Sequence, residues 1–154
     1  MNLSMEFSRK VALAYGEACK PLCRELNLPQ TAFDILLFLA NNPAYSTAAD
    51  IVEIRKIKAN LVSVNVDKLV RDGYLTRQAV AGDRRKTRLC CTEKAQPIIQ
   101  QGRQLQESFL ERLFRGIDPE TKAAFLKTLT MMNDNLDELL KGESPICKSY
   151  LRSL

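Results

Sequence analysis

The sequence contains no histidine and no tryptophan. The lack of an imidazole excludes Ser-His and Cys-His nucleophile pairs, imidazole-bound metals and the usual proton shuttle near neutral pH. A cysteine-dependent enzyme is the remaining catalytic alternative, and it would need a lysine or an acid as its base. We therefore expect no catalytic residues, no metal site and no cofactor.

The spacing of the cysteines matches no disulfide or zinc framework. The chain has five cysteines, an odd number, and no CxxC pair, so free thiols are expected. Cys19 and Cys23 lie on one face of an expected helix and are a candidate redox pair. The alternative is that both are small buried apolar side chains, since an i,i+4 pair is usually too far apart for an unstrained disulfide.

Long hydrophobic runs are also missing. The longest apolar run, Ile35–Ala40, is far shorter than the roughly 20 residues that span a bilayer. The first residues, MNLSMEFSRK, lack the basic-then-apolar order of a secretion signal. Apolar and charged residues make up 45% and 27% of the chain, which is typical of a globular protein. We expect a cytoplasmic protein with no membrane partner.

What the chain does have is a concentrated positive charge. Residues 53–88 contain ten Lys and Arg against four Asp and Glu, whereas the rest of the chain contains thirteen against fourteen. The whole of the net charge of +5 therefore comes from one stretch. A local basic patch on an otherwise balanced protein favours a polyanionic partner, because Lys and Arg side chains release the counterions of phosphates.

Hydrophobic periodicity predicts mostly helices. We expect helices over 5–24, from Pro29 to Asn41, a short one capped by Thr47 and Asp50, and one that ends at Gly73. The expected inward residues of the first helix are Phe7, Val11, Ala14, Ala18 and Leu22. Those of the fourth are Leu61, Val62, Val66, Leu69 and Val70.

Residues 74–91 alternate as two strands about the small-residue turn at 81–83, which predicts a β-hairpin. A long helix is expected from Thr92 to Gly116, and Asp118 is the expected cap of the last helix. That helix carries a seam of coiled-coil spacing, interpreted as core or dimer packing rather than a ligand site. The seam is Phe125, Leu129, Met132, Leu136 and Leu139.

Two short helices followed by a basic hairpin are the parts of a winged helix-turn-helix, whose second helix enters the DNA major groove. Small or polar residues near the start of that helix can approach base edges, and an arginine at the hairpin tip suits the minor groove. The candidate DNA-binding residues are Lys58, Asn60, Ser63, Val64, Lys68, Arg84, Arg85 and Lys86.

The stretch DKLVRDGYLTRQAVAGDRRKTRLCCTEKA resembles the signature of the MarR family of bacterial transcription regulators. The matching positions are Asp67, Lys68, Leu69, Gly73, Asp83, Arg84, Arg85, Thr92, Glu93 and Lys94. The resemblance implies one mainly α domain over 1–154, with a winged helix-turn-helix at 27–91 and a helical dimerisation region at 1–26 and 92–154. It also implies that Asp83 orients a wing arginine and that Asp67 forms an ion pair toward the wing.

The predicted function is a homodimeric, sequence-specific regulator that binds double-stranded DNA at a palindromic operator. Repression relieved by a small-molecule effector or by thiol oxidation is expected. The alternative is a winged-helix module that binds protein without reading DNA, which would favour an apolar wing rather than this cationic one. RNA binding is disfavoured because residues 53–88 offer only Tyr74 as a stacking platform.

Overall fold

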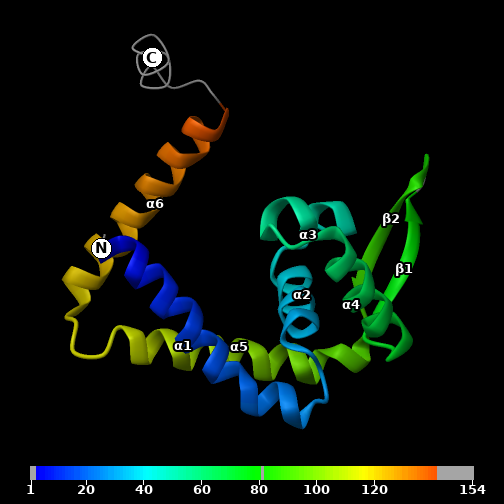
Figure 1. The fold of residues 1–154 in the computed structure, drawn as a ribbon, viewed down its shortest axis with the longest axis horizontal. Coiled ribbons are helices and arrows are strands. Elements are labelled where there is room, and N and C mark those ends of the chain that lie inside the picture. Colours follow the sequence, from blue (N-terminus) through cyan, green and yellow to red (C-terminus); the bar gives the residue numbers. More distant parts are fainter. Residues whose placement is uncertain (1–2, 81, 142–154) are drawn as a thin grey trace. The chain divides into compact units, whose positions relative to one another are not determined.

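The computed structural model describes residues 3–80 and 82–141, with the backbone alone for 3–5, 83–85 and 141. It is mainly helical with one two-stranded antiparallel sheet, as predicted (Figure 1). The elements are α1 (Leu3–Glu25), α2 (Gln30–Asn41), α3 (Ala48–Arg55), α4 (Ala59–Arg71), β1 (Leu75–Val80), β2 (Asp83–Cys91), the 3-10 helix η1 (Glu93–Ala95), α5 (Gln96–Leu113) and α6 (Pro119–Lys141).

The chain divides into two compact units, Met1–Leu110 and Glu111–Leu154. The first unit contains the helix pair, the hairpin and the hydrophobic core. Every helix in the described part of the chain is too short or too polar to cross a bilayer.

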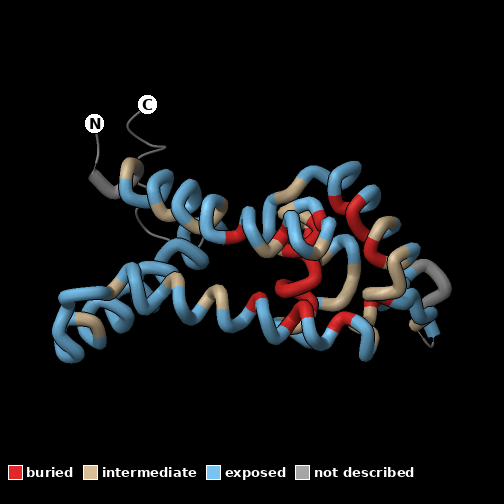
Figure 2. Tube along the Cα trace, turned by 90° about the horizontal axis from the view of Figure 1, so that it is seen from below, coloured by how far each residue is buried: buried red, intermediate tan, exposed pale blue. Residues whose placement is uncertain are grey.

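The core of the first unit is built around α2, as its nearly continuous apolar sequence predicts. Buried side chains occur on all sides of this helix, from Ala32 to Leu39, and Figure 2 shows buried positions concentrated in one part of the chain. Helix α5 lies directly on α2 at Gly102, where an added Cβ would come within 2.5 Å of Leu37 Cδ2. A glycine at this position therefore allows the close helix contact.

The predicted capping box at the start of α3 is confirmed. The Asp50 backbone N–H donates to the Thr47 hydroxyl at 3.1 Å, and the Thr47 backbone N–H donates to the Asp50 carboxylate at 2.8 Å. Partial burial acts to raise the Asp50 pKa, but hydrogen bonds from Thr47 and Ser46 to the carboxylate and the charge of Lys86 together outweigh it and lower the pKa. The negative charge thus stabilises the first turn of α3.

The predicted hairpin is also confirmed, and it contains an irregularity. Strands β1 and β2 pair from Leu75 with Cys91 to Ala79 with Thr87, and the register then shifts so that Val80 pairs with Asp83. Residues 84–86 therefore have no paired position on β1. The base of the hairpin is hydrogen-bonded to the loop between α2 and α3, because the Leu89 N–H donates to the Ser46 carbonyl at 2.7 Å.

The inward face of α1 differs from the predicted one. Ala14 and Ala18 are exposed, whereas Cys19 and Cys23 are buried against the core. Cys19, Cys23 and the partly buried Tyr15 and Leu22 lie on the side of α1 that packs on the core, whereas Phe7, also predicted to face inward, is 49% exposed. The predicted stripe was therefore placed too far round the helix.

In α4, Leu61 was predicted to face inward and is instead 46% exposed. The buried face consists of Val62, Asn65, Val66 and Leu69. Asn65 can be buried because its side-chain amide donates to the Leu61 carbonyl at 2.8 Å, which satisfies a donor that water would otherwise bind.

In the second unit, α6 begins as predicted. The Thr121 N–H donates to the Asp118 carboxylate at 2.9 Å, and the ring of Phe114 packs edge-on against Phe125 with centroids 5.9 Å apart. The remaining apolar seam of α6, from Leu129 to Leu139, is exposed in the single chain.

Candidate nucleic-acid interface

The first half of α4 presents a solvent-exposed face. Asn60, Ser63 and Val64 are all exposed, and Lys58 is the exposed N-cap residue. Lys58 provides no side-chain hydrogen bond to the helix, but the Asn60 side-chain oxygen accepts the Leu61 N–H at 2.9 Å. The Asn60 side chain thus satisfies one backbone N–H at the start of α4, and the exposed side chains of this turn remain accessible to a partner.

Asp67, one turn further along this face, pairs with the first wing strand. The Arg77 guanidinium on β1 donates to the Asp67 carboxylate at 2.5 Å. The pair joins α4 to the hairpin and neutralises the negative charge of Asp67. Arg77 was not among the predicted site residues, although strand alternation offered a signal: it lies two residues after the buried Leu75 and so points to the same side.

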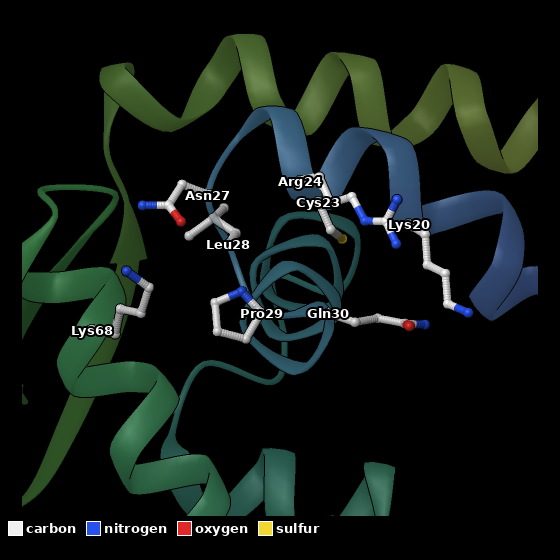
Figure 3. A pocket seen from close by; sticks show the side chains of 8 residues that line it. All are labelled: Lys20, Cys23, Arg24, Asn27, Leu28, Pro29, Gln30 and Lys68. Atoms are coloured by element: carbon white, nitrogen blue, oxygen red, sulfur yellow. The ribbon is translucent and has the colours of Figure 1, made fainter.

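Lys68, predicted to contact phosphate, lines a pocket beside the end of α1. Its ammonium group forms an ion pair with Asp72 at 2.9 Å. Figure 3 shows Lys68 near residues from the end of α1 and from the turn into α2. Together they line a pocket of about 500 Å³ whose walls are Lys20, Cys23, Arg24, Asn27, Leu28, Pro29, Gln30 and Lys68.

The hairpin supplies the remaining predicted residues. Lys86 is exposed on β2, as is the neighbouring Arg88. The side chains of Asp83, Arg84 and Arg85 lie outside the described residues, and only their backbone in β2 is placed. The exposed part of the arm is therefore cationic rather than apolar.

Three hydrogen bonds and one cation–π contact fasten the turn after α4 to the start of α5. The Thr92 hydroxyl donates to the Gly73 carbonyl at 2.7 Å, and the Thr92 N–H donates to the Tyr74 carbonyl at 3.0 Å. The Lys94 ammonium donates to the Asp72 carbonyl at 2.7 Å and lies 5.0 Å from the centre of the Tyr74 ring. Gly73 has φ of +80°, a conformation that favours glycine. The junction therefore depends on Gly73 as well as on Thr92 and Lys94.

The candidate redox pair lies in the core between α1 and α2. Cys19 is fully buried and Cys23 nearly so. Burial raises the pKa of both thiols, that of Cys23 to about 11, and likewise raises the pKa of the adjacent Tyr15 to about 12. A thiol is reactive as its thiolate, so this environment opposes oxidation. Within the described ranges, no group of His, Cys, Asp and Glu side chains could hold a metal ion.

Comparison with known proteins agrees with this geometry. The model of the MarR family matches residues 26–86, which include α2, α3, α4 and most of the hairpin. The transcriptional regulator PA3341 is 26% identical, with 88% of this chain and 96% of that chain covered and a TM-score of 0.74. Over residues 26–86 the chain is therefore similar to the MarR family.

Other MarR-family structures share the fold at lower identity. A MarR family transcriptional regulator from Listeria monocytogenes, solved with a 26mer DNA, is 19% identical, covers 93% of this chain and 95% of its own, and has a TM-score of 0.79. A MarR protein from Peptoclostridium difficile is 18% identical, with 93% of both chains covered and a TM-score of 0.78. The predicted resemblance and fold class are therefore confirmed.

The contacts at Thr92 and Lys94 give a physical reason for the MarR signature in this chain. The Thr-Glu-Lys sequence matters because two of its side chains bind carbonyls at the end of α4. The signature thus combines Asp67, which is exposed on α4, with residues that fasten the turn after α4 to the start of α5.

Proposed function

We propose that this chain is a MarR-family member and a sequence-specific regulator of transcription that binds double-stranded DNA in the cytoplasm. The observation that carries the proposal is the exposed start of α4, where Asn60, Ser63 and Val64 share one face beside the cationic hairpin arm. A helix fits the major groove and reads base edges from its N-terminal residues, while Lys and Arg on the wing contact phosphates or the minor groove.

We further propose that two copies act together. Helix α6 exposes a row of large apolar side chains, including Phe125, Leu129 and Met132. A separate groove of about 560 Å³ lies between α1 and α5, lined in part by Phe7 and Phe109. Exposed apolar surface of this extent favours burial against a second copy. A two-fold dimer would present its recognition helices to half-sites of a palindrome about 34–36 Å apart.

The proposed regulation is repression relieved by a small molecule. The pocket in Figure 3 supports this route, because it joins α1 to Lys68 on α4. A ligand there that displaced Lys68 from Asp72 would act on the end of the recognition helix. The burial of Cys19 and Cys23 gives no comparable support to thiol oxidation. A reporter gene placed behind the operator would test the sign: deletion of the regulator should raise expression, and lower expression would indicate an activator.

Fluorescence anisotropy with duplexes selected from a random pool tests DNA binding directly. We expect the logarithm of the affinity to fall linearly with the logarithm of the salt concentration. Arg85→Ala should weaken binding to all sequences and reduce the slope by about 0.9 for each phosphate that the variant no longer neutralises. Lys127→Ala, which removes an exposed cation on α6, is the matched control and should leave the slope unchanged.

Asn60→Ala should separate base reading from phosphate binding. Its expected effect is a relaxed base preference with an unchanged salt slope, because an amide contributes no counterion release. Failure of the wild-type chain to bind any duplex at low salt would overturn the proposed function and favour a protein-binding winged helix.

A further inference from the structure

The most exposed apolar side chain on α4 is in the middle of the face that we assign to DNA. Val64 is 66% exposed, whereas Val62 and Val66 on the same helix are buried. A single exposed apolar residue is common on protein surfaces. Here, however, Leu61 is exposed beside it, so the start of the helix offers branched methyl groups to its partner.

The polar groups of this face limit the bases that it can read. Asn60, Ser63, Val64 and Asp67 recur at three- and four-residue steps and so lie on one side of the helix. None of them is a cation, and the carboxylate of Asp67 is held by Arg77. Guanine in the major groove is most often recognised by Arg or Lys through its O6 and N7 atoms. The cations nearest to this face are the N-cap residue Lys58, Lys68, which is paired with Asp72, and Arg71, which follows Val64 by about 10 Å along the helix axis.

The amide of Asn60 and the exposed methyl groups of Leu61 and Val64 suit an A·T base pair. Thymine carries a C5 methyl group that projects into the major groove, and apolar side chains contact it. Adenine offers an N6 donor and an N7 acceptor, which match the oxygen and the NH₂ of an Asn amide. The Asn60 oxygen already accepts the Leu61 N–H, but a carbonyl oxygen has two lone pairs and can accept a second hydrogen bond.

We propose that Val64 packs against thymine methyl groups and makes α4 a reader of A·T base pairs. This inference rests on the proposed function and names the feature of the DNA that the recognition helix selects. Val64 is a specificity-determining residue in this assignment, while phosphate contacts supply most of the affinity. The half-site should contain thymines whose methyl groups are required for tight binding.

Deoxyuridine provides a direct probe, because it differs from thymidine only by the missing methyl group. The full-length protein is titrated with its selected duplex and with duplexes in which one thymine at a time is replaced by uracil. Burial of a methyl group is worth about 0.8 kcal/mol, so we expect about fourfold weaker binding at the thymine that Val64 contacts. Val64→Ala should bind the thymine and uracil duplexes equally at that position.

Ile54→Ala is the matched control, since Ile54 is also an exposed apolar residue but lies on α3. It should retain the fourfold preference for thymine, and circular dichroism should show all three proteins folded alike. Tight DNA binding by the wild type without any effect of uracil would overturn this inference and leave the proposed function standing. A thymine preference that persists in Val64→Ala would also overturn it, because another group would then read the methyl. No binding to any duplex would overturn both proposals.

Discussion

Replacement of Gly102 by alanine tests the close contact between α5 and α2. The added Cβ would lie 2.5 Å from Leu37 Cδ2 and 2.8 Å from Cδ1, whereas carbon atoms prefer separations of about 3.5–4.0 Å. The end of the Leu37 side chain must therefore move by about 1 Å. Leu37 is only 2% exposed, and a close-packed interior transmits such a displacement to its neighbours.

The expected loss of stability follows from two opposing effects. Overpacking of a core costs about 1–3 kcal/mol, and replacement of a helical glycine by alanine gains about 1 kcal/mol. The net result should be a free energy of unfolding about 1 kcal/mol lower. Gly16→Ala is the matched control, because its Cβ would be 3.6 Å from the nearest atom of Gln30. There the helix gain alone should raise stability by up to about 1 kcal/mol.

Urea denaturation followed by circular dichroism measures both changes. A double-mutant cycle adds a stricter test: Leu37→Ala costs about 2–5 kcal/mol alone, and it should remove most of the penalty of Gly102→Ala. The combined loss should therefore be smaller than the sum of the single losses. Additive losses, or a Gly102→Ala protein more stable than the wild type, would refute the packing argument.

Three further outcomes are expected. Thr92→Val should lower stability by about 1–3 kcal/mol in thermal or urea unfolding, because the Gly73 carbonyl loses its hydroxyl donor; an unchanged stability would show that water replaces it. Asp50→Asn should be less stable than the wild type above pH 4. The difference in stability should shrink as the pH falls below about 3.8, because the pKa of Asp50 is lowered in the folded protein and its contribution disappears on protonation. A stability difference independent of pH would contradict this. Cys19 and Cys23 should resist iodoacetamide in the folded protein at pH 7.5 and react after unfolding, which mass spectrometry of digests can measure. Rapid alkylation of either thiol in the folded protein would support the redox interpretation again.

The order of the elements could be predicted because local signals mark their ends. The capping box at Thr47, the glycine at the end of α4 and the Asp118 cap are chemical features within a few residues of sequence. The alternation of 74–91 likewise indicates a hairpin before any tertiary contact is known. These features reflect the backbone's own hydrogen-bonding needs, so they can be read without knowledge of the partners.

The edges of each buried face could not be predicted in the same way. Periodicity places a stripe on a helix, but the neighbouring elements decide which border residues are covered. Asn65 can be buried because its side chain donates to the Leu61 carbonyl within α4, whereas the Leu61 side chain itself is exposed. The ion pair between Asp67 and Arg77 joins two elements. Which residue of the hairpin reaches Asp67 depends on the angle between helix and hairpin, and no local pattern specifies that angle.

The grip of Thr92 and Lys94 on the last residues of α4 has a mechanical consequence. The turn after α4 and the residues before α5 are joined by these hydrogen bonds and form an elbow. Helix α4 has 13 residues and is about 20 Å long. A tilt of the elbow by about 10° therefore shifts the far tip of α4 by about 3.4 Å, which is the rise of one base pair. A turn of α5 that carried the elbow with it would therefore displace the tip by about one base-pair step.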